Sequence, residues 1–432
     1  MKKKIIISLA AVLTVAIGLG VFLGISPEFG GGNLSFATSV LAEDYSMIKS
    51  GKVGEDICFS KSDFEKTLGV ESACDITITA LPDESEGILK VGDVRLNVGD
   101  TVSADSLDML IFTPASISKE SSFSFTACGY MGGAEMKCKL LQRDGDNTAP
   151  SAGSATATVS TQKNISIWGR MDSVDPENDK TEYFVVSFPE KGRLEILSGY
   201  GDFKYTPDAD YTGNDSFSYI VRDCWGSFSE IATVNIKVEK NKIDLEYLDM
   251  LDCSAHNASL VLASEKIMLG KLCGDGMYFM PNESVSREEF VSMAMKAVGI
   301  EKIDGLENTC FDDDSEISDS LRPYIATAQK LGFINGSFDG NGLIFRPKSA
   351  ITRAEAAVIV SNMLNLTVST SSTPTFSDIE EIPSWAKGSI IAVYQNKIFS
   401  VTALDQMMID ANEELTRAQT AETLYAMMNS KS

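Results

Sequence analysis

The chain has 432 residues and a formal net charge of −24, because 61 acidic residues outnumber 37 basic ones. Such a length predicts about two to four domains. The acidic balance argues against broad binding to nucleic acid or to anionic membrane surfaces, since both need basic faces. The one histidine, His256, leaves too few imidazoles for Ser-His triads, Cys-His dyads or zinc sites, and we interpret it as a packing residue.

The first 42 residues have the pattern of a secretion signal. Lysines follow Met1, an uncharged apolar run extends over 5–25, and Val-Leu-Ala at 40–42 forms a plausible cleavage site. The apolar run is long enough to span a bilayer, so a retained anchor is the alternative. We therefore expect an exported protein with a signal peptide at 1–42.

Eight cysteines accompany this signal, and none forms a C-x-x-C pair, which gives no support to zinc-ribbon or thioredoxin-like sites. Cys128 and Cys138 flank a glycine-rich turn, and Cys253 and Cys273 lie close together further along the chain. A disulfide at either pair and small buried thiols are both open alternatives.

The N-terminal half has the alternating pattern of half-buried strands. Short apolar segments of period two lie between turn clusters in 51–147 and again in 148–240, with a polar linker at 144–150. The second stretch holds about seven such segments, which predicts a two-sheet sandwich. Its segment 205–219 closely resembles the bacterial Ig-like, cadherin-like repeats of surface proteins. We expect two all-β Ig-like sandwich modules, at 51–147 and 148–240.

Acidic residues crowd one loop of the second module. They are Asp172, Asp175, Glu177 and Asp179. Clustered carboxylate oxygens suit Ca²⁺. The other interpretation is a solvated acidic loop that turns at Pro176, since the segment lacks the glycine-anchored signature of a calcium loop. We therefore expect no metal or cofactor, and the alternative hypothesis is a Ca²⁺ ion bound by these carboxylates.

The C-terminal half contains a tetrapeptide that recurs three times. It reads Ser-Arg-Glu-Glu at 286–289, Thr-Arg-Ala-Glu at 352–355 and Thr-Arg-Ala-Gln at 416–419. A hydroxyl residue three positions before Glu or Gln is the capping box of a helix start. Capping does not require the arginine that stands at the first helical position of every copy.

Other residues keep the same register with these boxes, which indicates a triplicated unit of two helices. In the second unit a first helix is expected over 321–331, and the helix after the box shows one narrow face of small and apolar residues. A single pair of helices buries too little surface to fold alone, so the three should pack together. The registered residues are Gly270, Gly336 and Ser400; Phe279, Phe345 and Ile409; and three leading aspartates, Asp249, Asp313 and Asp378.

These units resemble the S-layer homology (SLH) domain. The resemblance rests on Gly-Phe-Ile-Asn-Gly at 332–336, Phe-Arg-Pro at 345–347, Ile-Thr-Arg-Ala-Glu at 351–355 and Phe-Ser-Asp at 376–378. It implies an α-helical pseudo-threefold bundle whose inter-repeat grooves bind secondary cell-wall polysaccharide, often through pyruvate-ketal carboxylates. The three repeats would lie at 243–300, 308–366 and 374–429.

An arginine at a helix N-terminus offers a planar set of donors beside free backbone N–H groups and the positive end of the helix dipole, which suits a carboxylate on a sugar. The alternative for each arginine is a structural salt bridge to a leading aspartate. We expect Arg353 to bind most strongly, because repeat three departs from the pattern at Ser400, Ala411 and Gln419. The expected ligand-binding residues are Arg353, Arg287, Arg417, Thr352, Gly336, Asp313, Asp249, Asp378 and Trp385.

The sequence therefore predicts a non-catalytic bacterial surface protein, secreted and held on the cell wall or S-layer by its repeats, with the wall polysaccharide as partner. Further partners would be a second copy of the protein, by self-association, or other surface proteins. The alternative is a wall-bound glycoside hydrolase or peptidoglycan-acting enzyme that uses a pair of carboxylates. Each β module has about ninety residues, fewer than a catalytic domain usually needs.

Overall fold

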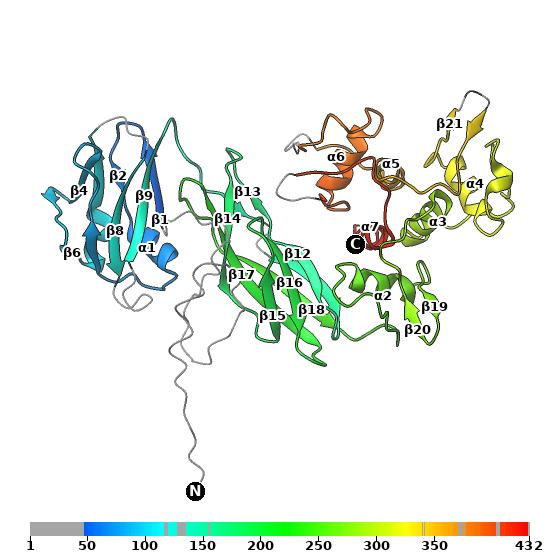
Figure 1. Ribbon diagram of the computed structural model, residues 1–432, viewed down its shortest axis with the longest axis horizontal. Helices are drawn as coiled ribbons and strands as arrows, with labels where there is room; N and C mark the ends of the chain where they lie inside the picture. The colour runs from blue at the N-terminus through cyan, green and yellow to red at the C-terminus, as the bar shows by residue number, and fades with distance from the viewer. Residues whose placement is uncertain are drawn as a thin grey trace, which may run out of the picture. The chain divides into compact units, whose positions relative to one another are not determined.

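A computed structural model describes residues 47–115, 120–127, 135–153, 156–338, 340, 342–369, 374, 376–402 and 407–430. The predicted signal peptide and Cys128 lie outside these residues. The predicted order is confirmed, because a β-rich N-terminal region precedes a helical C-terminal region (Figure 1). Within the described ranges, no helix is both long and apolar enough to cross a membrane.

The first β module consists of two sheets. Their strand orders are β1-β9-β8-β3-β6 and β2-β7-β4-β5, and β1 pairs with β9 in parallel. The aromatic side chains of Phe64, Phe112, Phe123 and Phe125 are buried in its core. The strands are β1 (Met47–Lys52), β2 (Ile57–Cys58), β3 (Ile76–Ala80), β4 (Gly87–Val91), β5 (Val94–Arg95), β6 (Thr101–Val102), β7 (Leu110–Pro114), β8 (Glu120–Ala127) and β9 (Glu135–Arg143).

This module departs from the all-β prediction. Helix α1 (Lys61–Leu68) follows a capping box between Ser60 and Asp63 and ends at Gly69 in the left-handed conformation. A 3₁₀ helix, η2, covers Ala104–Met109. The capping box and the C-terminal glycine were readable signals for α1. Strand β1 also begins at Met47, before the predicted start of the module at 51.

The second β module is built from three sheets. The larger two have the orders β11-β18-β17-β14 and β12-β16-β15, and β10 pairs with β13. Phe203 and Phe217 join the larger two, since their ring centroids lie 5.0 Å apart. The strands are β10 (Ser151–Ala152), β11 (Thr156–Gln162), β12 (Ile167–Arg170), β13 (Ser173–Val174), β14 (Thr181–Ser187), β15 (Gly192–Ile196), β16 (Asp202–Pro207), β17 (Gly213–Asp223) and β18 (Ala232–Glu239).

The helical region repeats one plan three times. Repeat one contains α2 (His256–Ser264), β19 (Lys271–Cys273), β20 (Gly276–Tyr278) and α3 (Arg287–Ala297). Repeat two contains η3 (Asp314–Glu316), α4 (Arg322–Lys330), β21 (Ser337–Phe338), β22 (Leu343–Ile344) and α5 (Arg353–Leu364). Repeat three contains α6 (Lys387–Gln395) and α7 (Arg417–Asn429). The three box helices, α3, α5 and α7, each begin at the predicted arginine.

The narrow apolar face predicted for α5 understates how far this helix is buried. Its buried residues occur on successive positions, among them Arg353, Ala354, Ala356 and Ala357, and therefore on several sides. Helix α5 packs against α6 and α3, and α7 packs against α2 and α3. The box helices thus form the centre of the helical region, where alanines allow close packing from several directions.

The cysteine alternatives are decided where the residues are described. Cys253 and Cys273 are both free thiols, so the disulfide between them is not formed. Cys138 is a free thiol on β9, and burial raises its pKa well above the ordinary value. Cys138 is thus a small packing group, Cys253 is half-buried and Cys273 is exposed.

Candidate functional site

The three repeats are joined by a closed ring of backbone hydrogen bonds just before the box helices. Val285 N–H donates to the Leu415 carbonyl at 3.2 Å, Leu415 N–H donates to Ile351 at 2.9 Å, and Ile351 N–H donates back to Val285 at 3.0 Å. Each residue precedes its box hydroxyl residue in the sequence. The ring gives the region the predicted threefold order.

The N-termini of the box helices are occupied by the protein itself. In every box helix, the first two N–H groups donate to loop carbonyls of the next repeat in cyclic order. The pairs are Arg287 to Ser349 and Glu288 to Pro347, Arg353 to Glu413 and Ala354 to Ala411, and Arg417 to Glu283 and Ala418 to Pro281. The third N–H donates to the box hydroxyl of Ser286, Thr352 or Thr416. The prediction of free N–H groups for an anion is therefore wrong.

Arg353 reaches from repeat two into repeat three. Its Nε donates to the Ile409 carbonyl and one Nη to the Ser400 carbonyl, both at 2.7 Å, while the guanidinium lies 5.0 Å from the ring centroid of Phe399. The side chain is 5% exposed, and burial lowers its pKa. Arg353 is thus a buried cation that carbonyls and an aromatic face hold in place.

Arg417 makes the corresponding contacts from repeat three into repeat one. It donates to the carbonyls of Phe279 and Leu269, both at 2.8 Å, and its guanidinium lies 4.8 Å from the Phe279 ring. Arg287 differs, because its Nη1 forms an ion pair with the carboxylate of Glu355. Its Nε is buried without a hydrogen-bond partner.

The leading aspartates hold loops rather than arginines. Asp378 accepts the N–H groups of Ile409 and Asp410, and Asp313 accepts those of Phe345 and Arg346. Asp249 does the same for the N–H groups of Phe279 and Met280. The second residue of each pair has a positive φ: Met280 (59°), Arg346 (56°) and Asp410 (48°). Each aspartate thus stabilises a strained turn, and among the described ion pairs none joins a box arginine to a leading aspartate.

Three further residues were predicted to bind ligand: two of them have a structural role, and the third lies outside the cavity described next. Thr352 caps α5. Gly336 has φ +69°, and a Cβ there would lie 2.5 Å from the Phe311 ring and 2.9 Å from the Ile344 carbonyl, so only glycine fits. Trp385 is 60% exposed just before α6 and is not part of the cavity described next.

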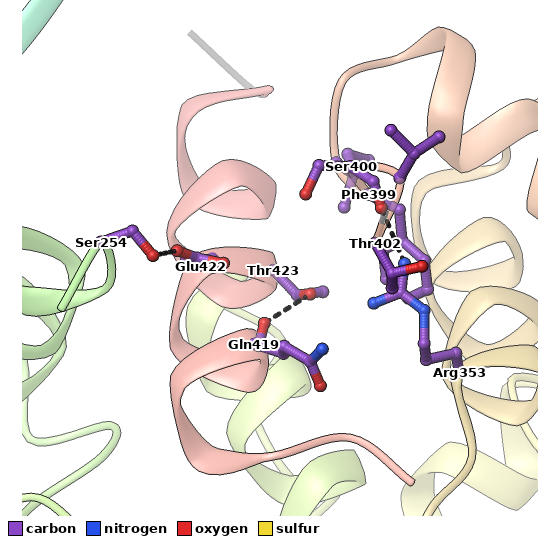
Figure 2. Close-up of a pocket in the computed structure, with 10 residues that line it drawn as sticks. Ser254, Arg353, Phe399, Ser400, Thr402, Gln419, Glu422 and Thr423 are labelled. Atoms are coloured by element: carbon purple, nitrogen blue, oxygen red, sulfur yellow. Dashed lines mark hydrogen bonds between the residues drawn. The ribbon is translucent and has the colours of Figure 1, made fainter. Parts of the chain in front are cut away.

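A cavity of about 280 Å³ lies between the repeats at Arg353. The loop 398–402 forms one wall and α7 the other, with Gln419 and Thr423 turned toward the space in front of the arginine and Glu422 turned toward Ser254 (Figure 2). Ser254 lies at the far side of α7, where its hydroxyl donates to Glu422 at 2.5 Å. Burial raises the pKa of Glu422. The cavity combines one buried cation with hydroxyl groups, which suits an anionic sugar.

The S-layer homology domain family matches residues 311–357 and 375–421, and the bacterial cadherin-like domain family matches 147–240. The chain carries SLH domains and a bacterial cadherin-like domain. SLH domains mark proteins of the bacterial cell surface and S-layer, so the predicted surface location is confirmed at that level. The cavity at Arg353 lies between the two matched SLH repeats.

Curated relatives share only part of their length with this chain. An exoglucanase, XynX of Acetivibrio thermocellus, is 33% identical over 172 residues, which cover 39% of this chain and 14% of the relative. An amylopullulanase of Thermoanaerobacterium thermosulfurigenes is 33% identical over 197 residues, 44% of this chain and 10% of the relative. A solved structure of the fibronectin(III)-like modules of Clostridium thermocellum CbhA aligns at 13% identity, over 50% of this chain and 98% of its own length. Its TM-score of 0.20 is too low to support an argument about the fold.

The acidic loop of the cadherin-like domain brings three of its four predicted ligands together. Carboxylate oxygens of Asp175, Glu177 and Asp179 all lie within 4.8 Å of one another, whereas Asp172 is not in the cluster. Asp175 is 8% exposed; its Oδ1 accepts the N–H groups of Glu177 and Asp179, and its Oδ2 is buried without a partner. Arg143 Nη1 lies 3.7 Å from Asp179 Oδ2 and supplies a nearby positive charge.

Several site residues were missed at the sequence level. Gln419 appeared only as a departure from the box pattern, and Ser254, Phe399 and Glu422 carried no motif. They reach the cavity because it is assembled from different repeats. His256, interpreted as a packing residue, is 9% exposed at the start of α2, and burial lowers its pKa.

Proposed function

We propose that the SLH repeats attach this protein non-covalently to secondary cell-wall polysaccharide, and that the cavity at Arg353 receives an anionic group of that polymer. The observation that supports this proposal most directly is the position of Arg353. It is a buried cation on the wall of a cavity and has no carboxylate bound to it within the described residues. A buried charge of this kind gains most from a ligand of opposite charge.

The overall charge fits this proposal. A net charge of −24 repels an anionic polymer at long range. Binding must therefore come from a short-range site that is screened from the rest of the protein. The hydroxyl groups of Ser254, Thr402 and Thr423 on the same cavity offer partners for sugar hydroxyls. The sugar carboxylate of a pyruvate ketal, implied by the SLH resemblance, is one anion that fits.

Co-sedimentation with wall sacculi tests the proposal. The full chain should sediment with intact sacculi and stay in solution with sacculi stripped of secondary polymer. Arg353→Gln should weaken binding about 10-fold or more, because a charge-assisted hydrogen bond contributes about 1.5–3 kcal/mol. Arg417→Gln is the matched control, since it removes the same type of carbonyl contacts. Undiminished binding to stripped sacculi, or equal losses in both variants, would refute the proposal.

We also propose that the chain has no catalytic activity of its own. The relatives that are named as an exoglucanase and an amylopullulanase share at most 14% of their length with it. Such a fraction supports a shared attachment region better than a shared catalytic domain. Release of reducing sugar from purified wall by this chain, abolished by substitution of acidic residues in the β modules, would contradict this proposal.

A Ca²⁺ site at Asp175, Glu177 and Asp179 is a second candidate function. The favouring observation is the buried Oδ2 of Asp175, which has no hydrogen-bond partner and lies within the carboxylate cluster. Titration with Ca²⁺, followed by calorimetry, should show binding that Asp175→Asn abolishes and Asp172→Asn retains. If the wild type and Asp175→Asn release equal heats of Ca²⁺ binding, the ion binds elsewhere.

A further inference from the structure

Two of the box arginines lie near the last residue of the capping box in the next repeat. Arg287 pairs with Glu355, and Arg353 shares its cavity with Gln419. These two positions are therefore comparable, and they differ in one chemical property: one holds a carboxylate and the other holds a neutral amide.

At Arg287 the carboxylate comes from within the chain. The ion pair between Arg287 and Glu355 occupies the guanidinium edge that would otherwise meet a ligand. The side chains of Arg287 and Glu355 are 12% and 27% exposed, so the pair is partly shielded from water. An external anion would have to displace Glu355 and leave a partly buried carboxylate without its partner, which is costly.

At Arg353 that internal competitor is missing. Gln419 keeps its capping role, because its Oε1 accepts the Thr416 N–H at 3.0 Å, as Glu355 Oε2 accepts the Thr352 N–H at 3.1 Å. Its Nε2 makes no hydrogen bond among the described residues. Figure 2 shows the Gln419 side chain extending from α7 into the space in front of Arg353. The amide thus adds a donor to the cavity where a glutamate would add a negative charge.

The surrounding charge limits what the cavity can take. Asp410, Glu422 and Asp378 are the acidic groups that act on Arg353 and oppose the effect of burial on its pKa. Because these carboxylates outnumber the cation, a singly charged carboxylate meets less repulsion here than a doubly charged phosphate would. A carboxylate also matches two donor groups side by side, the guanidinium edge and the amide.

We propose that Gln419 makes the Arg353 cavity the carboxylate-binding groove of this protein, and that Glu355 closes the corresponding position at Arg287. This inference rests on the proposed wall attachment and adds which groove binds, which residue determines it and which anion it takes. Gln419 is a specificity-determining residue, and the Glu-to-Gln difference between boxes is the switch between a closed and an open groove.

Two reciprocal substitutions test the proposal, each measured with the full chain and intact wall sacculi. Gln419→Glu restores the residue found in the other two boxes and keeps the cap. It should weaken sacculus binding about 10-fold or more, because a like charge then faces the ligand. Glu355→Gln, the matched control, keeps the cap and frees Arg287, so binding should be at least as strong as in the wild type. Circular dichroism should show both variants folded.

The outcomes separate this inference from the proposed function. If the wild type fails to bind sacculi, wall attachment itself is refuted. Two results with a wild type that binds would refute only the assignment of Gln419. In the first, Gln419→Glu binds sacculi as well as the wild type does. In the second, Glu355→Gln loses as much sacculus binding as Gln419→Glu. Sacculi whose carboxylates are converted to amides with carbodiimide should no longer bind the wild type. Retained binding to them would show that phosphate or another group is the anion.

Discussion

The cadherin-like domain and the helical repeats satisfy their backbone polar groups over different distances along the chain. In the cadherin-like domain, β14 pairs with β17 and β15 with β16 inside one segment, 147–240. In the helical region, the ring formed by Val285, Ile351 and Leu415 needs one residue from every repeat. The first arrangement keeps these strand pairs within one domain, whereas the second makes three repeats that depend on one another.

Removal of repeat three should give the largest effect. Without 374–429, the helical region loses Leu415, whose carbonyl accepts the Val285 N–H and whose N–H donates to the Ile351 carbonyl. It also loses the loop whose carbonyls accept the first two N–H groups of α5. We expect repeats one and two to lose their cooperative unfolding transition, since each unpaired buried group costs about 1–3 kcal/mol and core contacts are lost as well. Circular dichroism at 222 nm during thermal unfolding measures the transition.

Hydrogen exchange supplies the control for that variant. Amides of β14 and β17 should keep their protection, because their partners lie within the cadherin-like domain. A two-repeat protein that unfolds cooperatively, with wild-type protection in α3 and α5, would show that the ring is dispensable and would remove the contrast between the two regions.

Asp378→Ala should have the next largest effect. The carboxylate is 7% exposed and accepts the N–H groups of Ile409 and Asp410 in a left-handed turn. Its loss leaves both donors unpaired, and we expect a destabilisation of about 2–4 kcal/mol. Urea unfolding monitored by circular dichroism gives this value. Glu380→Ala, at a nearby exposed position, should change stability by less than about 0.5 kcal/mol; similar losses would mean that the turn does not need the carboxylate.

The sequence predicted more of the pattern within each repeat than of the contacts between repeats. The capping boxes, the arginines at the first helical position and the register of the leading aspartates are local features, and the structure contains all of them. The partners of those arginines lie in the next repeat, so no local spacing could identify Ile409 or Phe279 as acceptors. For the same reason the helix N-termini were expected to be free.

Two departures from the repeat pattern show where side-chain comparison misleads. The alanine at 411 suggested a degenerate repeat, yet the group that matters there is the backbone carbonyl, which accepts the Ala354 N–H at 2.8 Å as Pro347 accepts that of Glu288 at 3.1 Å. Gln419 looked like a departure of the same kind, whereas it lines the cavity at Arg353, where we propose a role for its neutral amide. A departure can be judged only when its neighbours across the repeat boundary are known.

The pH dependence of Glu422→Gln should give a smaller effect. Burial raises the pKa of Glu422 above its ordinary value of 4.5, although Ser254 and Arg353 partly oppose the shift. The folded state therefore favours the protonated carboxyl, and the charged form costs stability at neutral pH. Relative to the wild type, Glu422→Gln should therefore be more stable at pH 7.

That advantage should shrink as the pH falls through the raised pKa and disappear below 4.5, where the carboxyl is protonated in both folded and unfolded states. Urea unfolding at several pH values measures it. Wall binding by the wild type should also strengthen over the same range, because a neutral Glu422 no longer repels an anion in the cavity. A constant difference between variant and wild type at all pH values would exclude titration of Glu422 as the cause.

Ala411→Pro should give the smallest effect, and it should be favourable. Proline occupies the equivalent positions 281 and 347, each after a residue with positive φ, as Asp410 is before Ala411. The substitution keeps the carbonyl that accepts the Ala354 N–H, and no described hydrogen bond uses the N–H of Ala411. Because proline restricts the unfolded chain, we expect a stabilisation of about 0.4–1 kcal/mol.

Thermal unfolding of the helical region measures this gain, with Ala411→Gly as the opposite change at the same position. Glycine also keeps the carbonyl but makes the unfolded chain more flexible, so it should destabilise by a similar amount. If proline destabilises while glycine does not, the loop of repeat three has a shape that its counterparts in repeats one and two do not share.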